Sequence, residues 1–249
     1  MFVTLVCIGT FFLTLGEGDS GWTALAKSAI YKRSSGHAQG THNVSKEYRK
    51  PENLDARLTS LGEAQCEQLA VKAQYMNDIE LVVSSPLTRT LQTATLSFGS
   101  QMNAGVPFLA EESIRETVNY LCDCRRAIED IIPEFPGVEF SRIVHNEDEL
   151  WNRYARKYGC QESYTKRRES ADEAAIAQRA RMFFQWIKTR PEKEIAVVSH
   201  QAFLHHAFSH DQPSGANRVI EYLGQEDREF MMEWFDNCEL RTLVVDFEV

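Results

Sequence analysis

Strand-like and helix-like segments alternate along this chain, and that alternation constrains its fold more than any other feature. Residues 79–83 and 195–199 are short, largely apolar runs rich in β-branched side chains, which is typical of strands buried within a parallel sheet. Helical periodicity follows over about 87–98 and is clearest over 171–188. The sequence therefore predicts an α/β fold, with a mainly parallel central sheet and helices on both faces.

Weaker signals extend this framework. Residues 60–63 (Ser-Leu-Gly-Glu) form a capping-box pattern that predicts a helix start, and Pro86 suits the beginning of the next helix. The other expected elements are a first core strand at 26–31, helices at 147–158 and 201–209, and a final strand at 240–247. Because the chain has 249 residues and no tandem repeat, we expect a single domain over 26–249 after an N-terminal extension over 1–25.

The first 15 residues are mostly apolar and allow two interpretations. Ala24-Leu25-Ala26 resembles a signal-peptide cleavage site, which would make the protein secreted. However, no Lys or Arg precedes the apolar run, and Glu17 and Asp19 interrupt the approach to that site. The run is also too short for a comfortable membrane span. We therefore expect a cytoplasmic protein with no membrane span, in which this segment is an extra strand or a packing arm.

Charge and cysteine content argue against several kinds of protein. A net charge of -9 disfavours a non-specific nucleic-acid binder, although a pocket can be locally positive within an acidic protein. Six cysteines are too few for a disulfide scaffold in a chain of this size, and Cys66 fits a buried position in a helix. The Cys122-Asp123-Cys124 pattern has no second pair to complete a zinc site. We expect neither a metal nor another cofactor.

Side chains suited to phosphoryl chemistry gather where the expected strands end. They fall in four segments: residues 37–43 (His-Ala-Gln-Gly-Thr-His-Asn), 84–94 (Ser-Ser-Pro-Leu-Thr-Arg-Thr-Leu-Gln-Thr-Ala), 115–116 (Arg-Glu) and 197–200 (Val-Val-Ser-His). Because open α/β sheets bind ligands outside the carboxyl ends of their strands, these segments are expected to converge. Histidine can act as a nucleophile, the planar fork of Arg matches phosphate oxygens, and Glu can transfer a proton.

These segments resemble motifs of the histidine phosphatase superfamily, which has the phosphoglycerate-mutase-like fold, and within it the small phosphomutase-like branch of fungi and plants. Residues 37–43 are similar to the family's Arg-His-Ala-Gln-Gly-x-His-Asn stretch, and residues 55–62 to its Asp-x-x-Leu-Thr-x-x-Gly segment. Residues 84–94 are similar to its Ser-Pro-Leu-x-Arg-Thr-Leu-Gln-Thr-Ala block, and residues 197–200 to the strand that carries its second histidine. The resemblance extends from about residue 30 to the C-terminus and implies a three-layer sandwich.

The resemblance also implies a role for each site residue. His37 would be the nucleophile that takes the phosphoryl group, and Arg89 would clamp the phosphate oxygens. His200 would stabilise the charge that develops during transfer, Glu116 would give a proton to the leaving group, and Asn43 would help to line the pocket. The implied activity is that of a metal-independent phosphatase acting on a small phosphorylated substrate through a phosphohistidine. A phosphoglycerate-type mutase is the alternative within the family.

The sequence departs from the family's pattern at two places, and each leaves the identity of a site residue open. The family has an Arg directly before the nucleophile, where this chain has Gly36; either Arg33 folds back to replace it or one clamp is lost. Loss of such a donor costs about two to three orders of magnitude in rate, so a phosphate-binding pseudoenzyme is a further alternative. The middle of the chain also matches only loosely, so Glu111 or Glu112 could serve in place of Glu116.

No motif identifies the substrate or the oligomeric state. Substrate choice is expected to depend on residues 107–169, where Trp151, Arg153 and the basic run at 166–168 could reach an anionic ligand. A basic run is, however, more often a solvated face. Arg57 and Arg125 are expected to form salt bridges.

Overall fold

The computed structural model describes most of the chain, namely residues 2–8, 10–11, 24–29, 38–76, 78–159, 168–169, 172–209, 219–222 and 224–247. Arg33, Gly36 and His37, on which part of the sequence analysis depends, lie outside the described residues. Their expected roles therefore stay predictions.

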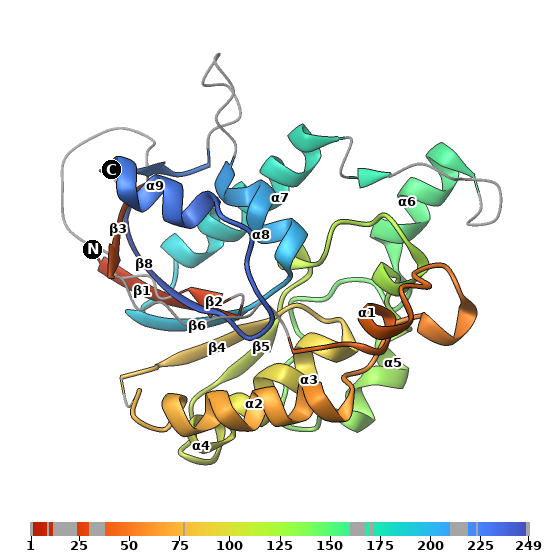
Figure 1. The fold of residues 1–249 in the computed structure, drawn as a ribbon, viewed down its shortest axis with the longest axis horizontal. Coiled ribbons are helices and arrows are strands. Elements are labelled where there is room, and N and C mark those ends of the chain that lie inside the picture. Colours follow the sequence, from red (N-terminus) through yellow and green to blue (C-terminus); the bar gives the residue numbers. More distant parts are fainter. Residues whose placement is uncertain are drawn as a thin grey trace.

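A mixed sheet forms the centre of the structure (Figure 1), with the strand order β5-β4-β6-β1-β8-β3-β7. Strands β5, β4, β6 and β1 run parallel, whereas β8 is antiparallel to both β1 and β3. This arrangement confirms the predicted α/β class. The strands are β1 (Phe2–Ile8), β2 (Thr10–Phe11), β3 (Ala24–Ala29), β4 (Leu81–Ser84), β5 (Phe108–Ala110), β6 (Glu194–Val198), β7 (Glu221–Tyr222) and β8 (Leu240–Phe247).

Helices cover both faces of the sheet. In Figure 1, α7, α8 and α9 lie on one side of the strands, and α2, α3 and α4 lie on the other. The helices are α1 (Thr41–Ser45), α2 (Ser60–Ala73), α3 (Thr88–Ser97), α4 (Gly99–Asn103), α5 (Ile128–Ile131), α6 (Glu149–Tyr158), α7 (Glu173–Lys188), α8 (Gln201–Ser209) and α9 (Gln225–Met232). Single 3-10 turns are η1 (Pro51–Asn53), η2 (Glu112–Ile114), η3 (Leu121–Asp123) and η4 (Ile132–Glu134). No helix among the described residues is long and apolar enough to cross a bilayer.

Strand β4 contributes apolar side chains to the hydrophobic clusters on both faces of the sheet. Leu81, Val82 and Val83 are all fully buried. Because successive strand residues point to opposite faces, Leu81 and Val83 join the cluster that contains Phe183 of α7, whereas Val82 joins the cluster that contains Leu91 of α3. A strand covered on both faces needs such a continuous apolar run.

Two local expectations are wrong. The helix expected from the 60–63 capping box is capped by Thr59 instead, whose hydroxyl accepts a hydrogen bond from Gly62 N–H at 3.0 Å, so Ser60 is already helical. The strand expected first in the core, at 26–31, is β3, which pairs with antiparallel β8 and with the short parallel strand β7, outside the parallel group β5-β4-β6-β1. The place beside β6 is taken by β1, from the apolar start of the chain. The division into an extension and a domain stays a prediction.

Candidate active site

The carboxyl ends of β4 and β6 bring His200 and Ser85 together. Ser85 directly follows β4, and His200 lies between the end of β6 and the start of α8. Both side chains are fully buried, and His200 Nε2 lies 2.8 Å from Ser85 Oγ. The neighbouring Ser199 hydroxyl donates to the carbonyl of Ile114 at 2.7 Å. Side chains from the ends of β4 and β6 and a backbone carbonyl from η2 thus lie close together at the edge of the sheet.

Arg89 reaches the same region from the first turn of α3. It is fully buried, and its Nη1 donates to the carbonyl of Cys122 at 2.8 Å. The nearest carboxylate, that of Asp123, is at 3.5 Å, and Arg89 Nε has no hydrogen-bond partner among the described residues. A buried cation is stable only when it is well paired and hydrogen-bonded, and the described partners leave Arg89 Nε without an acceptor.

The start of α3 is held in place by a carboxylate from another segment. Asp55 accepts hydrogen bonds from the Thr88 N–H at 2.8 Å and the Thr88 hydroxyl at 2.5 Å. It also accepts one from Arg126 Nε at 3.0 Å. A carboxylate at a helix N-terminus satisfies a backbone donor and favours the helix dipole. Asp55 therefore fixes the turn from which Arg89 projects.

Glu116 is half-buried, and its carboxyl group has a shifted pKa. Its Oε1 accepts hydrogen bonds from Thr117 N–H at 2.8 Å and from Phe203 N–H, in the first turn of α8, at 3.0 Å. Burial and then the charge of Asp123 raise the pKa of Glu116 to about 7, against the opposing effect of Arg89. A carboxyl group with this pKa can both give and accept a proton near neutral pH.

The other candidate carboxylates are occupied. Glu111 accepts hydrogen bonds from both the backbone and the hydroxyl of Ser113 and pairs with Arg142. Glu112 pairs with Arg115 at 2.6 Å and with Arg125 at 3.4 Å. Both therefore form ion pairs with arginine, whereas Glu116 forms no ion pair with the described residues.

The segment that follows His37 is fixed against α2. Gln39 N–H donates to Gln65 Oε1 at 2.9 Å, and Gln39 O accepts from Thr59 N–H at 2.8 Å. A Cβ atom on Gly62 would lie only 2.4 Å from Gln39 O, so the helix can approach this closely only with glycine at position 62. Asn43 Oδ1 accepts from Gly40 N–H at 2.9 Å and so stabilises the turn into α1. Its contact with a phosphate stays a prediction.

Comparison with known proteins decides the family. Residues 36–218 match the model of the histidine phosphatase superfamily (branch 1). The chain belongs to the histidine phosphatase superfamily. It is 36% identical over 243 residues to a phosphoglycerate mutase-like protein of Arabidopsis thaliana, covering 84% of this chain and 82% of the relative. It is also 25% identical over 167 residues to a probable phosphatase of Schizosaccharomyces pombe, covering 66% and 70%.

Solved structures also match this chain, at lower sequence identity. A putative α-ribazole-5'-P phosphatase from Escherichia coli superposes with a TM-score of 0.45 at 18% identity, over 79% of this chain and 84% of the other. The match of the family model over residues 36–218 confirms the predicted resemblance to the superfamily.

Other predicted contacts have mixed outcomes. Arg57 pairs with Glu134, and Arg125 pairs with Glu112, as expected. Arg168, expected on a solvated face, is instead fully buried, with its guanidinium 4.5 Å from the centre of the Trp151 ring. It is buried because it donates to the carbonyl of Gly159 and packs on an aromatic face. Among the described residues, no group of three or more His, Cys, Asp or Glu side chains is placed to hold a metal.

Sequence reasoning missed three residues that support the histidine phosphatase site. Ser85 touches His200, Asp55 holds the first turn of α3, and Asp123 pairs with Arg89. Asp55 begins one of the recognised motifs, so its position was a usable signal. In the sequence Asp123 belongs only to the incomplete Cys122-Asp123-Cys124 metal pattern, and nothing in its sequence neighbourhood indicates that it is buried against Arg89.

Proposed function

We propose that this protein is a metal-independent phosphatase that hydrolyses a small phosphorylated substrate through a phosphohistidine on His37. The observation that carries the proposal is the buried Arg89 guanidinium, held at one nitrogen by Cys122 O and without a partner at Nε among the described residues. Among the described residues, the carboxylate that pairs with it is that of Asp123, at 3.5 Å. A phosphoryl group would supply the oxygens that this fork lacks.

The reaction has two steps. A ring nitrogen of His37 attacks phosphorus, the bond from phosphorus to the substrate oxygen breaks, and that oxygen takes a proton from Glu116. Water then attacks the phosphohistidine, gives its proton to Glu116 and releases inorganic phosphate and free His37. Positioning and fixed positive charge supply most of the rate in phosphoryl transfer. Arg89, together with His200 beside Ser85, is proposed to stabilise the charge that develops on the phosphoryl oxygens.

A pKa near 7 suits Glu116 for both steps. In the first step the group must be protonated, and in the second it must be ionised. Its pKa of about 7 allows both forms to be populated at neutral pH. Asp123 supports the site twice, since it pairs with Arg89 and raises the pKa of Glu116.

Hydrolysis of p-nitrophenyl phosphate in the presence of a chelator tests this proposal. Wild-type protein is expected to release p-nitrophenol at a rate that the chelator leaves unchanged, and His37→Ala is expected to abolish turnover. Activity that survives His37→Ala, or that disappears with chelator, would contradict the proposed chemistry.

A mutase would use the same residues but return the phosphoryl group to a second position of the substrate. The plant relative is named for its likeness to phosphoglycerate mutase, and the yeast relative is named a probable phosphatase. No motif in the sequence distinguishes a mutase from a phosphatase, so hydrolysis is our proposal. Supplying 3-phosphoglycerate and measuring the 2-isomer against free phosphate separates the two activities.

The second candidate function is phosphate binding without turnover, which Gly36 favours. The resemblance places an Arg at this position, and its loss would remove one positive charge from the site. Vanadate binding measured by calorimetry, with no turnover over hours, would support this candidate. A gain of turnover in Gly36→Arg would show that the missing Arg is the cause.

We also propose that the protein acts in the cytoplasm, because residues 2–8 form β1 between β6 and β8 of the central sheet and so are used by the fold. Secretion of a C-terminal fluorescent fusion, with loss of residues 1–26, would contradict this location.

A further inference from the structure

Two cysteines that the proposed chemistry does not use lie in contact inside the protein. Cys66 belongs to α2, and Cys238 lies far along the chain, shortly before β8. Cys66 is fully buried in a cluster with Ala38 and Leu58, and Cys238 packs against that cluster. The two thiols are hydrogen-bonded to each other, and both are free. The fold therefore brings together two thiols from distant segments.

The turn that presents Cys238 is fixed by its neighbours. Cys238 has a φ of 58°, in the left-handed region that residues other than glycine seldom adopt. Asp236 N–H donates to Glu239 Oε2 at 3.0 Å, and the Glu239 carboxylate pairs with Arg241 at 2.7 Å. These contacts hold the turn in this conformation, so the fold itself sets the contact between the two sulfur atoms.

The surroundings of the pair favour the loss of one proton. The Cys238 thiol, hydrogen-bonded to Cys66, lowers the pKa of Cys66 against the opposing effect of burial, and the hydroxyls of Thr93 and Ser97 act in the same direction. Since one sulfur can be ionised while the other keeps its proton, the pair combines a thiolate, the reactive form of cysteine, with a thiol beside it. Cys238 is only half-buried, so a small oxidant can approach the pair from its side.

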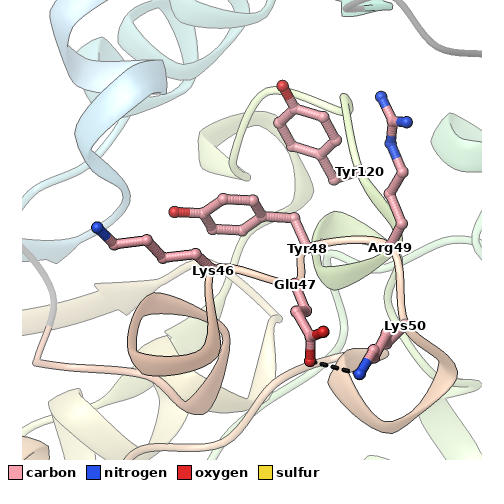
Figure 2. A pocket seen from close by; sticks show the side chains of 6 residues that line it. All are labelled: Lys46, Glu47, Tyr48, Arg49, Lys50 and Tyr120. Atoms are coloured by element: carbon pink, nitrogen blue, oxygen red, sulfur yellow. Dashed lines mark ion pairs between the residues drawn. The ribbon is translucent and has the colours of Figure 1, made fainter.

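Cys122 and Cys124 are the other two cysteines whose side chains the structure describes. Cys122 is bonded to the segment drawn in Figure 2, since its N–H donates to Tyr48 O at 3.1 Å. Its Sγ donates to the Asp123 carboxylate at 3.5 Å, and Cys124 Sγ donates to the carbonyl of Arg125 at 3.6 Å. Burial raises the pKa of both thiols, that of Cys124 to about 12. Neither is therefore activated for oxidation.

We propose that Cys66 and Cys238 form a reversible disulfide when the protein meets a hydroperoxide, and that this disulfide slows turnover at the neighbouring site. The thiolate of the pair attacks one oxygen of hydrogen peroxide, the O–O bond breaks, and the other oxygen takes up a proton and leaves as water. The second thiol then attacks the oxidised sulfur, the S–O bond breaks, and the hydroxyl group leaves as water with the proton of that thiol. Two electrons pass from the two sulfurs to the peroxide. Disulfides of cytosolic proteins are typically transient in this way.

The disulfide would join segments that lie next to the proposed site. Ala38 directly follows His37 and packs in the same cluster as Cys66. The hydroxyl of Thr93, which is hydrogen-bonded to Cys66, donates to the carbonyl of Arg89 at 2.7 Å. A disulfide bond of about 2.05 Å is shorter than the contact between two separate thiols, so its formation must move one segment. Close packing passes that movement to the neighbours. The effect on turnover rests on the proposed function, whereas formation of the disulfide does not.

Peptide mapping of peroxide-treated protein tests the disulfide directly. The folded, full-length protein is treated with hydrogen peroxide, its free thiols are blocked with N-ethylmaleimide, and its digest is analysed by mass spectrometry. We expect a peptide that links Cys66 to Cys238, that dithiothreitol separates, and that forms before Cys122 or Cys124 is modified. Cys238→Ser should abolish the link, and Cys124→Ser, the matched control at another half-buried cysteine, should retain it. Free thiols at both positions after Cys124 has been oxidised, or a link that forms only in urea, would overturn the proposal.

Turnover of p-nitrophenyl phosphate by the same samples separates the effect on the site from the proposed function. In the oxidised wild type kcat/KM should fall about ten- to a hundredfold, since a displacement of about 1 Å can cost this much, and dithiothreitol should restore it. Cys238→Ser should keep its rate after the same treatment. If the linked protein turns over as fast as the reduced one, the effect on the site is overturned. If the reduced wild type hydrolyses no phosphate ester, the phosphatase is wrong, and the linked peptide alone decides whether the disulfide forms.

Discussion

The Asp123 carboxylate lies 3.5 Å from the guanidinium of Arg89, and both side chains are buried. Asp123 also accepts hydrogen bonds from the backbone of Asn119 at 3.2 Å and of Tyr120 at 2.9 Å, so its position is fixed. Because its charge raises the pKa of Glu116 as well, one carboxylate influences both the phosphate clamp and the proposed proton donor.

Asp123→Asn is expected to shift the pH profile of turnover. If Glu116 must be protonated in the first step, kcat/KM falls as pH rises through its pKa of about 7. Removing the neighbouring negative charge lowers that pKa, so the decline should begin about one pH unit lower. The measurement is kcat/KM for p-nitrophenyl phosphate from pH 5 to 9. Asp148→Asn, which disturbs the buried pair with Arg115, is the control and should leave the position of the decline unchanged. A decline that moves upward in Asp123→Asn would contradict the assignment.

Arg89→Lys is expected to lower kcat/KM by about two to three orders of magnitude. Lysine keeps the charge but lacks the planar fork that bonds Cys122 O at one nitrogen and leaves another for phosphate oxygens. The value of kcat/KM, measured by steady-state kinetics, and the affinity for vanadate should both decrease. Arg57→Lys is the control, since Arg57 is half-exposed and pairs with Glu134. Near-normal turnover in Arg89→Lys would mean that the guanidinium does not bind the reacting group.

Glu116→Gln is expected to change how stability depends on pH. A carboxyl group whose pKa is raised from 4.5 to about 7 holds its proton more tightly when folded, so it stabilises the fold at low pH. This contribution is lost as pH rises from about 5 to about 7, and at most it is on the order of 3 kcal/mol. Urea denaturation across this pH range should show that the free energy of unfolding of the wild type falls as pH rises. The fall should be smaller in Glu116→Gln. If the free energy of unfolding depends on pH in the same way in both proteins, the pKa of Glu116 is not raised by folding.

Gly62→Ala is expected to destabilise the fold and to reduce turnover. Alanine gains up to about 1 kcal/mol over glycine within a helix, but its Cβ would meet Gln39 O at 2.4 Å, on the segment that follows His37. Backbone overlap of this kind costs about 1–3 kcal/mol, so the clash should prevail. The matched control is Gly99→Ala at the start of α4, where an added Cβ has no atom within 4 Å. Chemical denaturation should show the control to be as stable as the wild type or more stable, and a stabilised Gly62→Ala would contradict the packing described.

Local sequence patterns predicted the main strands and helices well. A strand that is buried on both faces has a continuous apolar run, which is easily recognised in the sequence. The run at 195–199 and the helix at 171–188 correspond to β6 and α7 with shifts of only one or two residues. The cap at Thr59 was missed because Ser60 offers the same chemistry one position later. Only tertiary structure shows that the Thr59 hydroxyl lies against Gln39, where Thr59 Oγ1 donates to Gln39 O at 3.2 Å.

The site itself was less predictable, because its supporting contacts join distant segments. Arg89, Glu116 and His200 follow from motifs, and the structure gathers them. The carboxylates of Asp55 and Asp123 gain their importance from partners 33 and 34 residues away. No local periodicity encodes such pairings.

The central claim is that His37 carries the phosphoryl group between substrate and water. Its most direct test is rapid quenching of the wild-type protein with p-nitrophenyl phosphate at alkaline pH, followed by mass-spectrometric mapping of acid-labile phosphate. The account predicts one phosphohistidine, on His37, that builds up further in Glu116→Gln with an activated leaving group because the water step then lacks its base. Phosphate on another residue, or turnover with no phosphohistidine at any time point, would contradict it.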